Sequence, residues 1–196
     1  MKTLILNGSP KKNGDTTALI DELSRHLKGE IKVISSVFDR ISPCVDCRYC
    51  WSHPGCAIAD DMPYDYLEAC DNIVIASPVW FSELSGPLLY LASRIQTYCA
   101  AKYFRKEPIR IEHKNGLLLL VGAEPGTEEK AIATAQTIFK HMNALSCVPS
   151  VFSMNTNNVP AMKDAAALAE IRNAAARLNQ LYHDRLQNNS ARYDGT

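Results

Sequence analysis

Four cysteines lie close together in one short segment, at a spacing that can ligate metal. Cys44, Cys47, Cys50 and Cys56 follow the pattern C-x2-C-x2-C-x5-C. Thiolates two residues apart on a turn can converge on one cluster, as they do in bacterial ferredoxin sequences. Structural zinc usually draws on two cysteine pairs that are far apart in the sequence. The spacing therefore favours an iron–sulfur cube over zinc.

Other interpretations of these cysteines stay open. A zinc site remains an alternative, because spacing alone does not decide which metal is bound. Four buried thiols could also act simply as small hydrophobic side chains. His53 lies inside the segment and is expected to be a surface residue. The other cysteines, Cys70, Cys99 and Cys147, fall in predicted helices or a strand and are expected to pack in the core.

A second segment with chemical potential lies near the N-terminus. The apolar strand Leu4–Leu6 runs into a polar loop, and a helix is predicted from Thr16 to about Lys28. The free N–H groups of the first helical turn and the helix dipole make such a junction an anion site. Side chains that add hydrogen-bond donors or positive charge are Ser9, Lys11, Lys12, Asn13, Thr16 and Thr17.

This loop does not match the two best-known phosphate motifs. Gly8 and Gly14 are separated by five residues, and Asp15 and Thr16 follow where a P-loop has Lys-Ser/Thr. The dinucleotide fingerprint needs three glycines in six residues, and this loop has only two glycines. The loop therefore suits a terminal phosphate monoester.

Two later loops are expected to face this phosphate site. The predicted strand Ile73–Ala76 leads into Ser77–Ser82, which contains Trp80 and Phe81, and the strand Leu117–Val121 leads into Gly122–Gly126. In open α/β sheets, ligands bind beyond the carboxyl ends of the strands. An aromatic pair in such a loop suits a planar ring, although the pair could also simply pack the loop onto the core.

Apolar runs alternate with helical patterns along the 196 residues. Most of the runs are continuous, as burial on both faces of a parallel sheet demands, and the alternation of runs and helical patterns predicts a doubly wound α/β sheet with helices on both faces. The predicted strands are Leu4–Leu6, Ile31–Val37, Ile73–Ala76, Leu117–Val121 and Val148–Phe152, and the predicted helices span 16–28, 62–70, 86–99, 127–145 and 162–187. We expect one domain over 1–187, a Cys-rich insertion at 40–62 and a polar tail at 188–196.

The composition excludes several classes of partner. Lys plus Arg and Asp plus Glu both number 21, so the net charge is zero and neither nucleic acid nor membrane is indicated as a partner. Neither a signal peptide nor a membrane-spanning apolar run is recognised. The cysteines are odd in number and clustered, which favours a reducing, cytoplasmic setting.

Taken together, these motifs resemble a known family. Asn7–Lys11 with Asn13–Thr16, Asp60–Met62, Ser77–Phe81 and Ser85–Pro87 are similar to motifs of the flavodoxin-like NAD(P)H-dependent FMN reductases, and more narrowly to the iron–sulfur flavoprotein branch. The resemblance covers roughly residues 1–155. It implies a five-stranded parallel sheet of order 2-1-3-4-5, FMN at the switch point, and a homodimer or homotetramer.

The resemblance also implies roles for individual residues. The FMN phosphate would be held by Ser9, Lys11, Asn13, Thr16 and Thr17; the isoalloxazine ring would be lined by Pro78, Val79, Trp80, Phe81 and Ser82 and edged by Gly122, Ala123 and Glu124. A 4Fe–4S cluster would be ligated by Cys44, Cys47, Cys50 and Cys56, in a loop expected near the flavin end of the sheet. Some relatives carry a similar loop without a cluster, as part of a dimer surface.

Three positions depart from the family pattern. Asp15 stands where the family often has Asn or Ser, Trp80 replaces a usual Tyr, and Ser93-Arg94 replaces Asp-Arg. A carboxylate beside a phosphate weakens binding unless it points away or caps the helix.

The implied activity is transfer of electrons from NAD(P)H through FMN to a quinone, a flavin or a similar acceptor. Hydride passes directly from nicotinamide to flavin, so no catalytic side chain is expected. The alternative is an iron–sulfur flavoprotein electron carrier with little NAD(P)H activity. The neutral charge counts against a flavodoxin-type carrier, and the flavin loops count against a metal or redox sensor.

Overall fold

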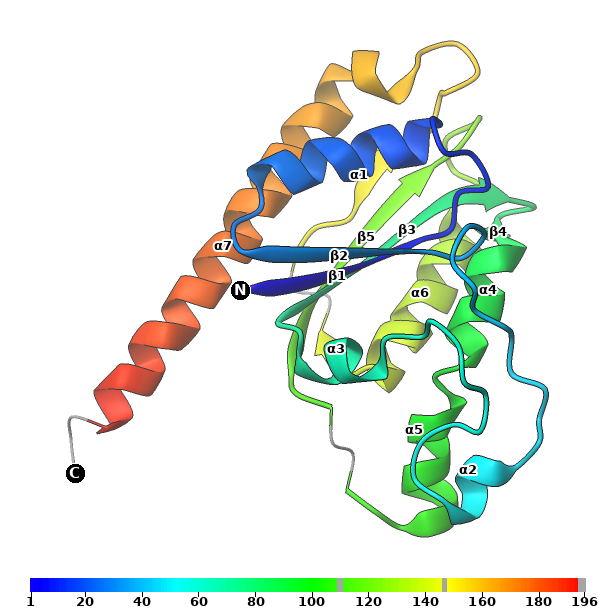
Figure 1. The fold of residues 1–196 in the computed structure, drawn as a ribbon. Helices are drawn as coiled ribbons and strands as arrows, with labels where there is room; N and C mark the ends of the chain where they lie inside the picture. The colour runs from blue at the N-terminus through cyan, green and yellow to red at the C-terminus, as the bar shows by residue number, and fades with distance from the viewer. Residues whose placement is uncertain (109–110, 146–147, 194–196) are drawn as a thin grey trace.

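The computed structural model describes residues 1–108, 111–145 and 148–193, so Cys147 lies outside the described residues. Its sheet has the order β2-β1-β3-β5-β6, with β4 added to β3 and β7 to β5 (Figure 1). The strands are β1 (Lys2–Asn7), β2 (Glu30–Ser35), β3 (Asn72–Trp80), β4 (Glu83–Leu84), β5 (Lys114–Val121), β6 (Ala144–Leu145) and β7 (Val151–Ser153).

This topology confirms the predicted flavodoxin-like α/β fold. All strand pairs are parallel except β3 with β4. The sheet has seven strands rather than five, because two short strands, β6 and β7, share the fifth position and β4 forms a hairpin with β3.

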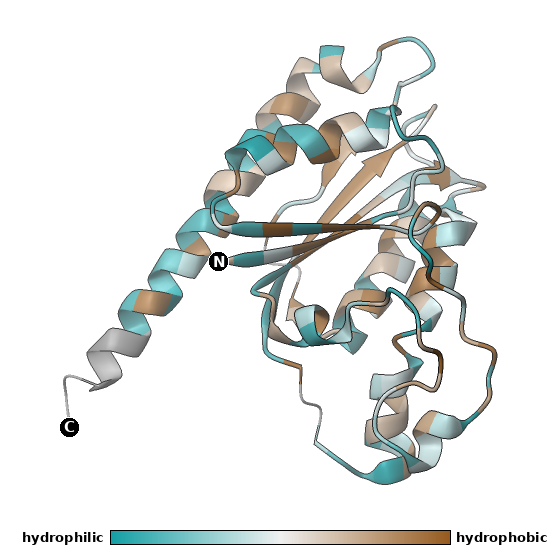
Figure 2. Ribbon diagram, viewed as in Figure 1, coloured by the Kyte–Doolittle hydropathy of each residue, from teal (hydrophilic) through white to brown (hydrophobic). Residues whose placement is uncertain are grey.

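Helices cover both faces of the sheet, with α1 (Asp15–His26) and α7 (Ala165–Tyr193) on one side and α3 (Tyr64–Ala69), α4 (Gly86–Ser93) and α6 (Glu129–His141) on the other (Figure 1). Leu4 and Leu6 pack into the core on the α4 and α6 side, and Ile5 packs into the core on the α1 and α7 side. Successive strand residues point to opposite faces, so a continuous apolar run fills both cores. Figure 2 shows another such apolar run as brown colour along β5.

The remaining helices are α2 (Tyr49–Ser52), α5 (Gln96–Ala100), the π-helix η1 (Ala101–Arg105) and the 3-10 helix η2 (Ala161–Lys163).

One predicted helix is broken. The expected helix at 86–99 divides into α4 and α5. At the break, the Arg94 amide donates to the Leu91 carbonyl and the Ile95 amide donates to the Ala92 carbonyl, so each hydrogen bond spans three residues instead of the four of an α-helix. At the C-terminus α7 continues past the predicted helix end at Gln187. Within the described residues, no helix is both long and apolar enough to cross a lipid bilayer.

Candidate functional site

A cleft of about 240 Å³ lies at the carboxyl ends of the parallel strands. It is formed by the carboxyl end of β3 and by the loops after β1, β5 and β7, as the strand-end rule predicts for this fold. The predicted site residues that line it are Ser9, Lys11, Thr16, Pro78, Val79, Trp80, Gly122 and Ala123.

One end of the cleft is the junction of β1 and α1. Gly14 is the N-cap of α1, and no side chain caps this helix end. The first-turn amides are therefore available to an anion. The Ser9 and Thr16 side chains are buried beside them, and the Lys11 amide donates a 3.2 Å hydrogen bond to Ser9 Oγ.

Gly8 allows the loop to pass close to α4. Ser85 Oγ donates a 2.7 Å hydrogen bond to the Gly8 carbonyl. A Cβ atom added to Gly8 would lie only 2.7 Å from Ser85 Oγ. No larger residue fits without moving Ser85, so the glycine sets the path of the loop.

The Asp15 carboxylate is bound to another part of the chain. Its Oδ1 accepts a 2.8 Å hydrogen bond from the Ala161 amide, at the start of η2. Asp15 still lies along the cleft, in the first turn of α1 rather than at its N-cap. One oxygen of the Asp15 carboxylate is therefore hydrogen-bonded to the backbone at the start of η2.

The other end of the cleft contains the β3–β4 hairpin. Trp80 is 44% exposed and lines the cleft. The hairpin turn is Phe81-Ser82, with φ angles of 53° and 63°. A two-residue turn of this kind requires positive φ at both positions, and here it directs the Phe81 side chain fully into solvent.

Five predicted site residues do not line the cleft: Asn13, Thr17, Phe81, Ser82 and Glu124. The Thr17 hydroxyl donates to the Lys11 carbonyl at 3.1 Å, and Glu124 is exposed. The Ser82 carbonyl accepts from the Ala131 amide at 3.0 Å, which fixes the hairpin turn on α6.

The loop after β7 adds two residues that we did not predict from the sequence. Thr156 and Asn157 line the cleft opposite the β1 loop. The Thr156 amide and hydroxyl both donate to the Gly122 carbonyl at 3.0 Å. The strand-end rule, applied to the predicted fifth strand as well, would have found both residues.

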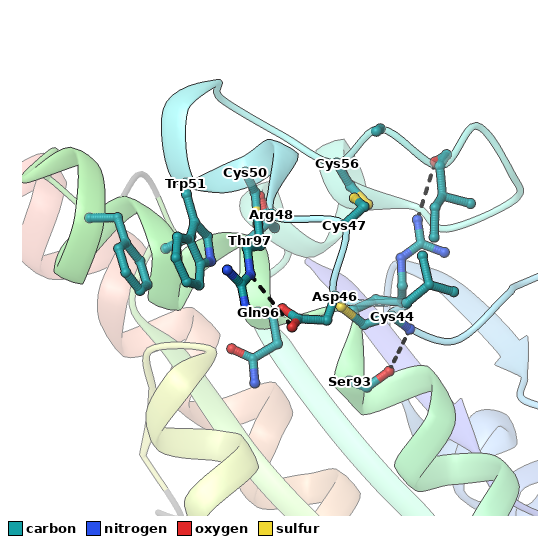
Figure 3. Close-up of a pocket in the computed structure, with 16 residues that line it drawn as sticks. Cys44, Asp46, Cys47, Arg48, Cys50, Trp51, Cys56, Ser93, Gln96 and Thr97 are labelled. Carbon is teal, nitrogen blue, oxygen red and sulfur yellow. Dashed lines mark hydrogen bonds and ion pairs between the residues drawn. The ribbon is translucent and has the colours of Figure 1, made fainter.

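A second cavity, of about 440 Å³, contains the four clustered cysteines (Figure 3). We call it the cysteine pocket; its thiols come from Cys44, Cys47, Cys50 and Cys56. Burial raises the pKa of the Cys50 thiol, and the charges of the Cys44, Cys56 and Cys47 thiolates would raise this pKa further. All four are free thiols.

The expectation that these cysteines lie near the flavin end of the sheet is wrong. The segment leaves the carboxyl end of β2 and then runs back along α4 toward α5 and η1 (Figure 1). The cysteine pocket is lined by Ser93, Arg94, Thr97 and Phe104, and it shares no residue with the cleft.

Among the described residues, no three His, Cys, Asp or Glu side chains lie close enough together to hold one metal ion. A 4Fe–4S cube takes four thiolates, one on each of its four irons, and the cysteine pocket is lined by four thiols.

A buried ion pair holds the ends of this segment. Arg94 Nη1 lies 2.5 Å from Asp60 Oδ2, and the Arg94 side chain is fully buried. Burial raises the pKa of the Asp60 carboxyl, but hydrogen bonds from Arg94 and from the Ser42 and Met62 amides outweigh it and leave the pKa lowered.

Asp60 is expected to contribute stability at neutral pH that is lost in acid. Asp60→Asn leaves the buried Arg94 cation uncompensated, which should lower the free energy of unfolding by about 3–5 kcal/mol near pH 7. Because the folded pKa is below the unfolded value of about 3.9, this difference should persist at higher pH and shrink as the pH falls through the folded pKa. Urea unfolding of both proteins across this range measures it.

The adjacent Asp61 is the matched control. It pairs with Arg40, and both side chains are largely exposed, so Asp61→Asn should change the unfolding free energy by less than about 1 kcal/mol. An equal loss from both substitutions would contradict the role assigned to the buried pair.

Comparison with known proteins decides the family. The family model of the NADPH-dependent FMN reductases matches residues 1–158. The chain belongs to this family. It is therefore an FMN-dependent NAD(P)H oxidoreductase, as the sequence motifs predict.

Named relatives place the chain in the iron–sulfur flavoprotein-like branch of the family. It is 26% identical over 186 residues to an iron-sulfur flavoprotein of Methanosarcina thermophila, covering 91% of this chain and 93% of the relative. It is 31% identical over 142 residues to one of Archaeoglobus fulgidus, covering 68% and 69% of the two chains.

Solved structures share the fold. RosB superposes with a TM-score of 0.71 at 16% identity, covering 99% of this chain and 87% of RosB. An NAD(P)H:quinone oxidoreductase from Methanothermobacter marburgensis superposes with a TM-score of 0.65 at 16% identity, covering 93% and 98% of the two chains.

Proposed function

We propose that the cleft binds FMN with its phosphate at the start of α1 and its ring against Trp80, and that NAD(P)H reduces it there. The observation that supports this orientation is the arrangement of the cleft. Buried hydroxyls and uncapped amides lie at one end, and a half-exposed indole lies at the other. Bound FMN would supply the redox chemistry, accepting hydride from a nicotinamide and passing electrons to an acceptor.

The phosphate would interact with the first-turn amides of α1 and the hydroxyls of Ser9 and Thr16. Both hydroxyls are nearly inaccessible to solvent, so a phosphate oxygen beside them would be shielded from competing water. Lys11 adds an exposed positive charge along the same end of the cleft. These contacts exist only for a phosphorylated flavin.

The ring would lie between the carboxyl end of β3 and the loop after β5. Pro78, Val79 and Trp80 offer apolar surface on one side, and the backbone of Gly122 and Ala123 offers polar groups at the edge. Gly122 approaches Met154 so closely that an added Cβ would lie 2.5 Å from Met154 Cε. The absence of a side chain at Gly122 therefore leaves room for Met154.

Trp80 should quench the fluorescence of bound FMN, because an indole stacked on the flavin ring interacts with it directly. We expect Trp80→Ala to brighten bound FMN. The chain's other tryptophan, Trp51, stacks on Phe104 at 3.9 Å in the cysteine pocket and serves as the control. Steady-state emission of FMN-saturated, cluster-free variants makes the comparison. Equal brightening by Trp51→Phe, or none by Trp80→Ala, would contradict the ring position.

The four thiols of the cysteine pocket support a second function, binding of a 4Fe–4S cluster. Such a cluster supplies one-electron chemistry, so it would convert two-electron input at FMN into one-electron output. The acceptor is then a protein or a one-electron carrier rather than a quinone or free flavin. In that case the chain acts as an iron–sulfur flavoprotein electron carrier with little NAD(P)H activity of its own.

We also propose that the chain forms a homodimer or homotetramer in the cytoplasm. Exposed aromatic side chains gather on α4, η1 and the cysteine segment, and such patches commonly mark interfaces. They are Tyr49, Trp51, Tyr90, Tyr103 and Phe104. Free thiols in the described cysteines fit a reducing compartment. The zero net charge supports a function without nucleic acid or membrane.

A further inference from the structure

We propose that Arg94 is a positioning residue that closes the cysteine segment and gives the cysteine pocket its shape before any cluster is bound. This inference rests on the proposed binding of a 4Fe–4S cluster. Arg94 is one of the largest fully buried side chains of the protein, and the flavin cleft does not include it. Its charge and hydrogen bonds are directed to the segment that carries the thiols.

The guanidinium bonds to both ends of that segment. Nη1 donates to the Ser42 carbonyl at 2.8 Å and to Asp60 Oδ2 at 2.5 Å. Nη2 donates to the Ile58 carbonyl at 3.2 Å. Ser42 precedes Cys44 and Ile58 follows Cys56, so all four cysteines lie in a loop whose ends meet at one buried cation. Fixing these ends removes much of the entropy that an open loop would lose on binding a cluster.

Neighbouring side chains hold the loop between its ends. Ser93 Oγ accepts a 2.9 Å hydrogen bond from the Cys44 amide. Thr97 Oγ1 donates to the Gly55 carbonyl at 2.9 Å, next to Cys56. Arg105 Nη1 donates to the Cys50 carbonyl. These contacts all come from one continuous stretch, α4, α5 and η1, so the backbone beside three of the four cysteines is held by protein alone.

The shape of the guanidinium matters as well as its charge. Arg94 Nε donates to the Tyr64 hydroxyl at 3.1 Å, in addition to the three bonds to the segment. A lysine would keep the positive charge but offers a single ammonium on a flexible stem. It cannot bond to the Ser42 carbonyl, the Ile58 carbonyl and Tyr64 from one fixed plane. Arg94→Lys therefore separates the positioning role from simple charge balance.

The flavin cleft should not depend on this contact. Helix α4 is anchored to the cleft by its other end, where the Ser85 amide donates to Ser77 Oγ at 2.9 Å and Ser85 Oγ donates to the Gly8 carbonyl. An eight-residue helix spans about 12 Å, so Arg94 lies well away from these bonds. FMN binding is therefore an internal check that a variant is folded.

The test compares the full-length protein with Arg94→Lys and Ser93→Ala after anaerobic reconstitution with iron and sulfide. Iron per chain and the half-life of the cluster in the presence of an iron chelator are measured, with FMN stoichiometry as the check on folding. We expect Arg94→Lys to shorten the cluster half-life by about 10–100-fold, the range typical for residues that orient metal ligands. Ser93→Ala removes the bond from the Cys44 amide and a 2.6 Å bond from Ser93 Oγ to the Tyr90 carbonyl within α4. It should shift the half-life in the same direction even if Arg94→Lys fails to fold. Arg185→Lys alters an ion pair between Arg185 on α7 and Asp71, which directly precedes β3. This substitution should leave the half-life unchanged.

A second readout needs no cluster. Hydrogen exchange of the backbone amides of the cysteine segment, in metal-free protein, should be faster in Arg94→Lys or Ser93→Ala than in the wild type. If wild-type protein takes up no iron, cluster binding is wrong, and faster exchange in the variants still supports the positioning role. Unchanged exchange in both variants would overturn the role of Arg94 whether or not iron is bound.

Discussion

Replacing Ser9 or Thr16 by alanine is expected to weaken FMN binding by about 1–3 kcal/mol for each substitution, or about 5–150-fold in Kd. Each substitution would leave a phosphate oxygen without its hydroxyl partner, and both of these side chains are buried. Riboflavin lacks the phosphate, so its affinity should be nearly unchanged. Titration of cofactor-free protein with FMN and with riboflavin, followed by flavin fluorescence, gives both dissociation constants.

Thr137 provides the control for this comparison. Its hydroxyl donates to the Ala133 carbonyl on the exposed side of α6, away from the cleft. Thr137→Ala should bind both flavins as the wild type does. If wild-type protein bound riboflavin as tightly as FMN, or if the alanine variants lost affinity for both flavins equally, the phosphate would not lie at the start of α1.

Cys47→Ser is expected to abolish the stable 4Fe–4S cluster. Reconstituted wild-type protein should hold about four irons per chain, and the variant close to none, because a serine hydroxyl is a poor replacement for a thiolate ligand. Cys47 is the most informative choice, since its side chain is exposed in the structure and supports little of the core. Metal analysis and EPR of the reduced protein, both under anaerobic conditions, measure the outcome. Oxygen would attack exposed thiolates and must be excluded.

Cys99 supplies a matched cysteine outside the cysteine pocket. Its Sγ lies 3.3 Å from His141 Nδ1, between α5 and α6, and burial raises the pKa of this thiol. Cys99→Ser should retain the full iron content. Iron uptake that is equal in the wild type and Cys47→Ser would show that the four thiols serve the fold or a subunit surface instead.

The sheet was predictable because its signal is local. The run Leu117–Leu120 is buried on both faces, and continuous burial of this kind is typical of a central parallel strand. The break between α4 and α5 was not predictable in the same way. It occurs at Arg94, whose partners Ser42, Ile58 and Asp60 are far away in the sequence. The burial of Cys70 was predicted correctly, whereas Cys99 is only half-buried.

The cleft was predictable where it depends on strand ends. Ser9, Thr16, Trp80 and Gly122 meet because β1, β3 and β5 are parallel and adjacent. The direction of Phe81 was missed, because a two-residue turn with positive φ usually carries Asn-Gly or a similar pair rather than Phe-Ser.

The place of the cysteine pocket was also missed, for a different reason. Cysteine spacing indicates that thiols can converge, but it carries no information on where the loop runs after β2. That path is set by contacts with α4, α5 and η1. Long-range hydrogen bonds to a buried arginine are not visible as a pattern in the sequence.

FMN bound in the cleft should accept hydride from a nicotinamide. Anaerobic mixing of FMN-loaded protein with NADPH, and separately with NADH, tests this hydride transfer directly through the flavin absorbance at about 450 nm. At least one nicotinamide should bleach this band with a stoichiometry of about one per FMN, since hydride carries two electrons and FMN accepts two. A flavin that stays oxidised with both nicotinamides, yet is bleached by dithionite, would contradict it.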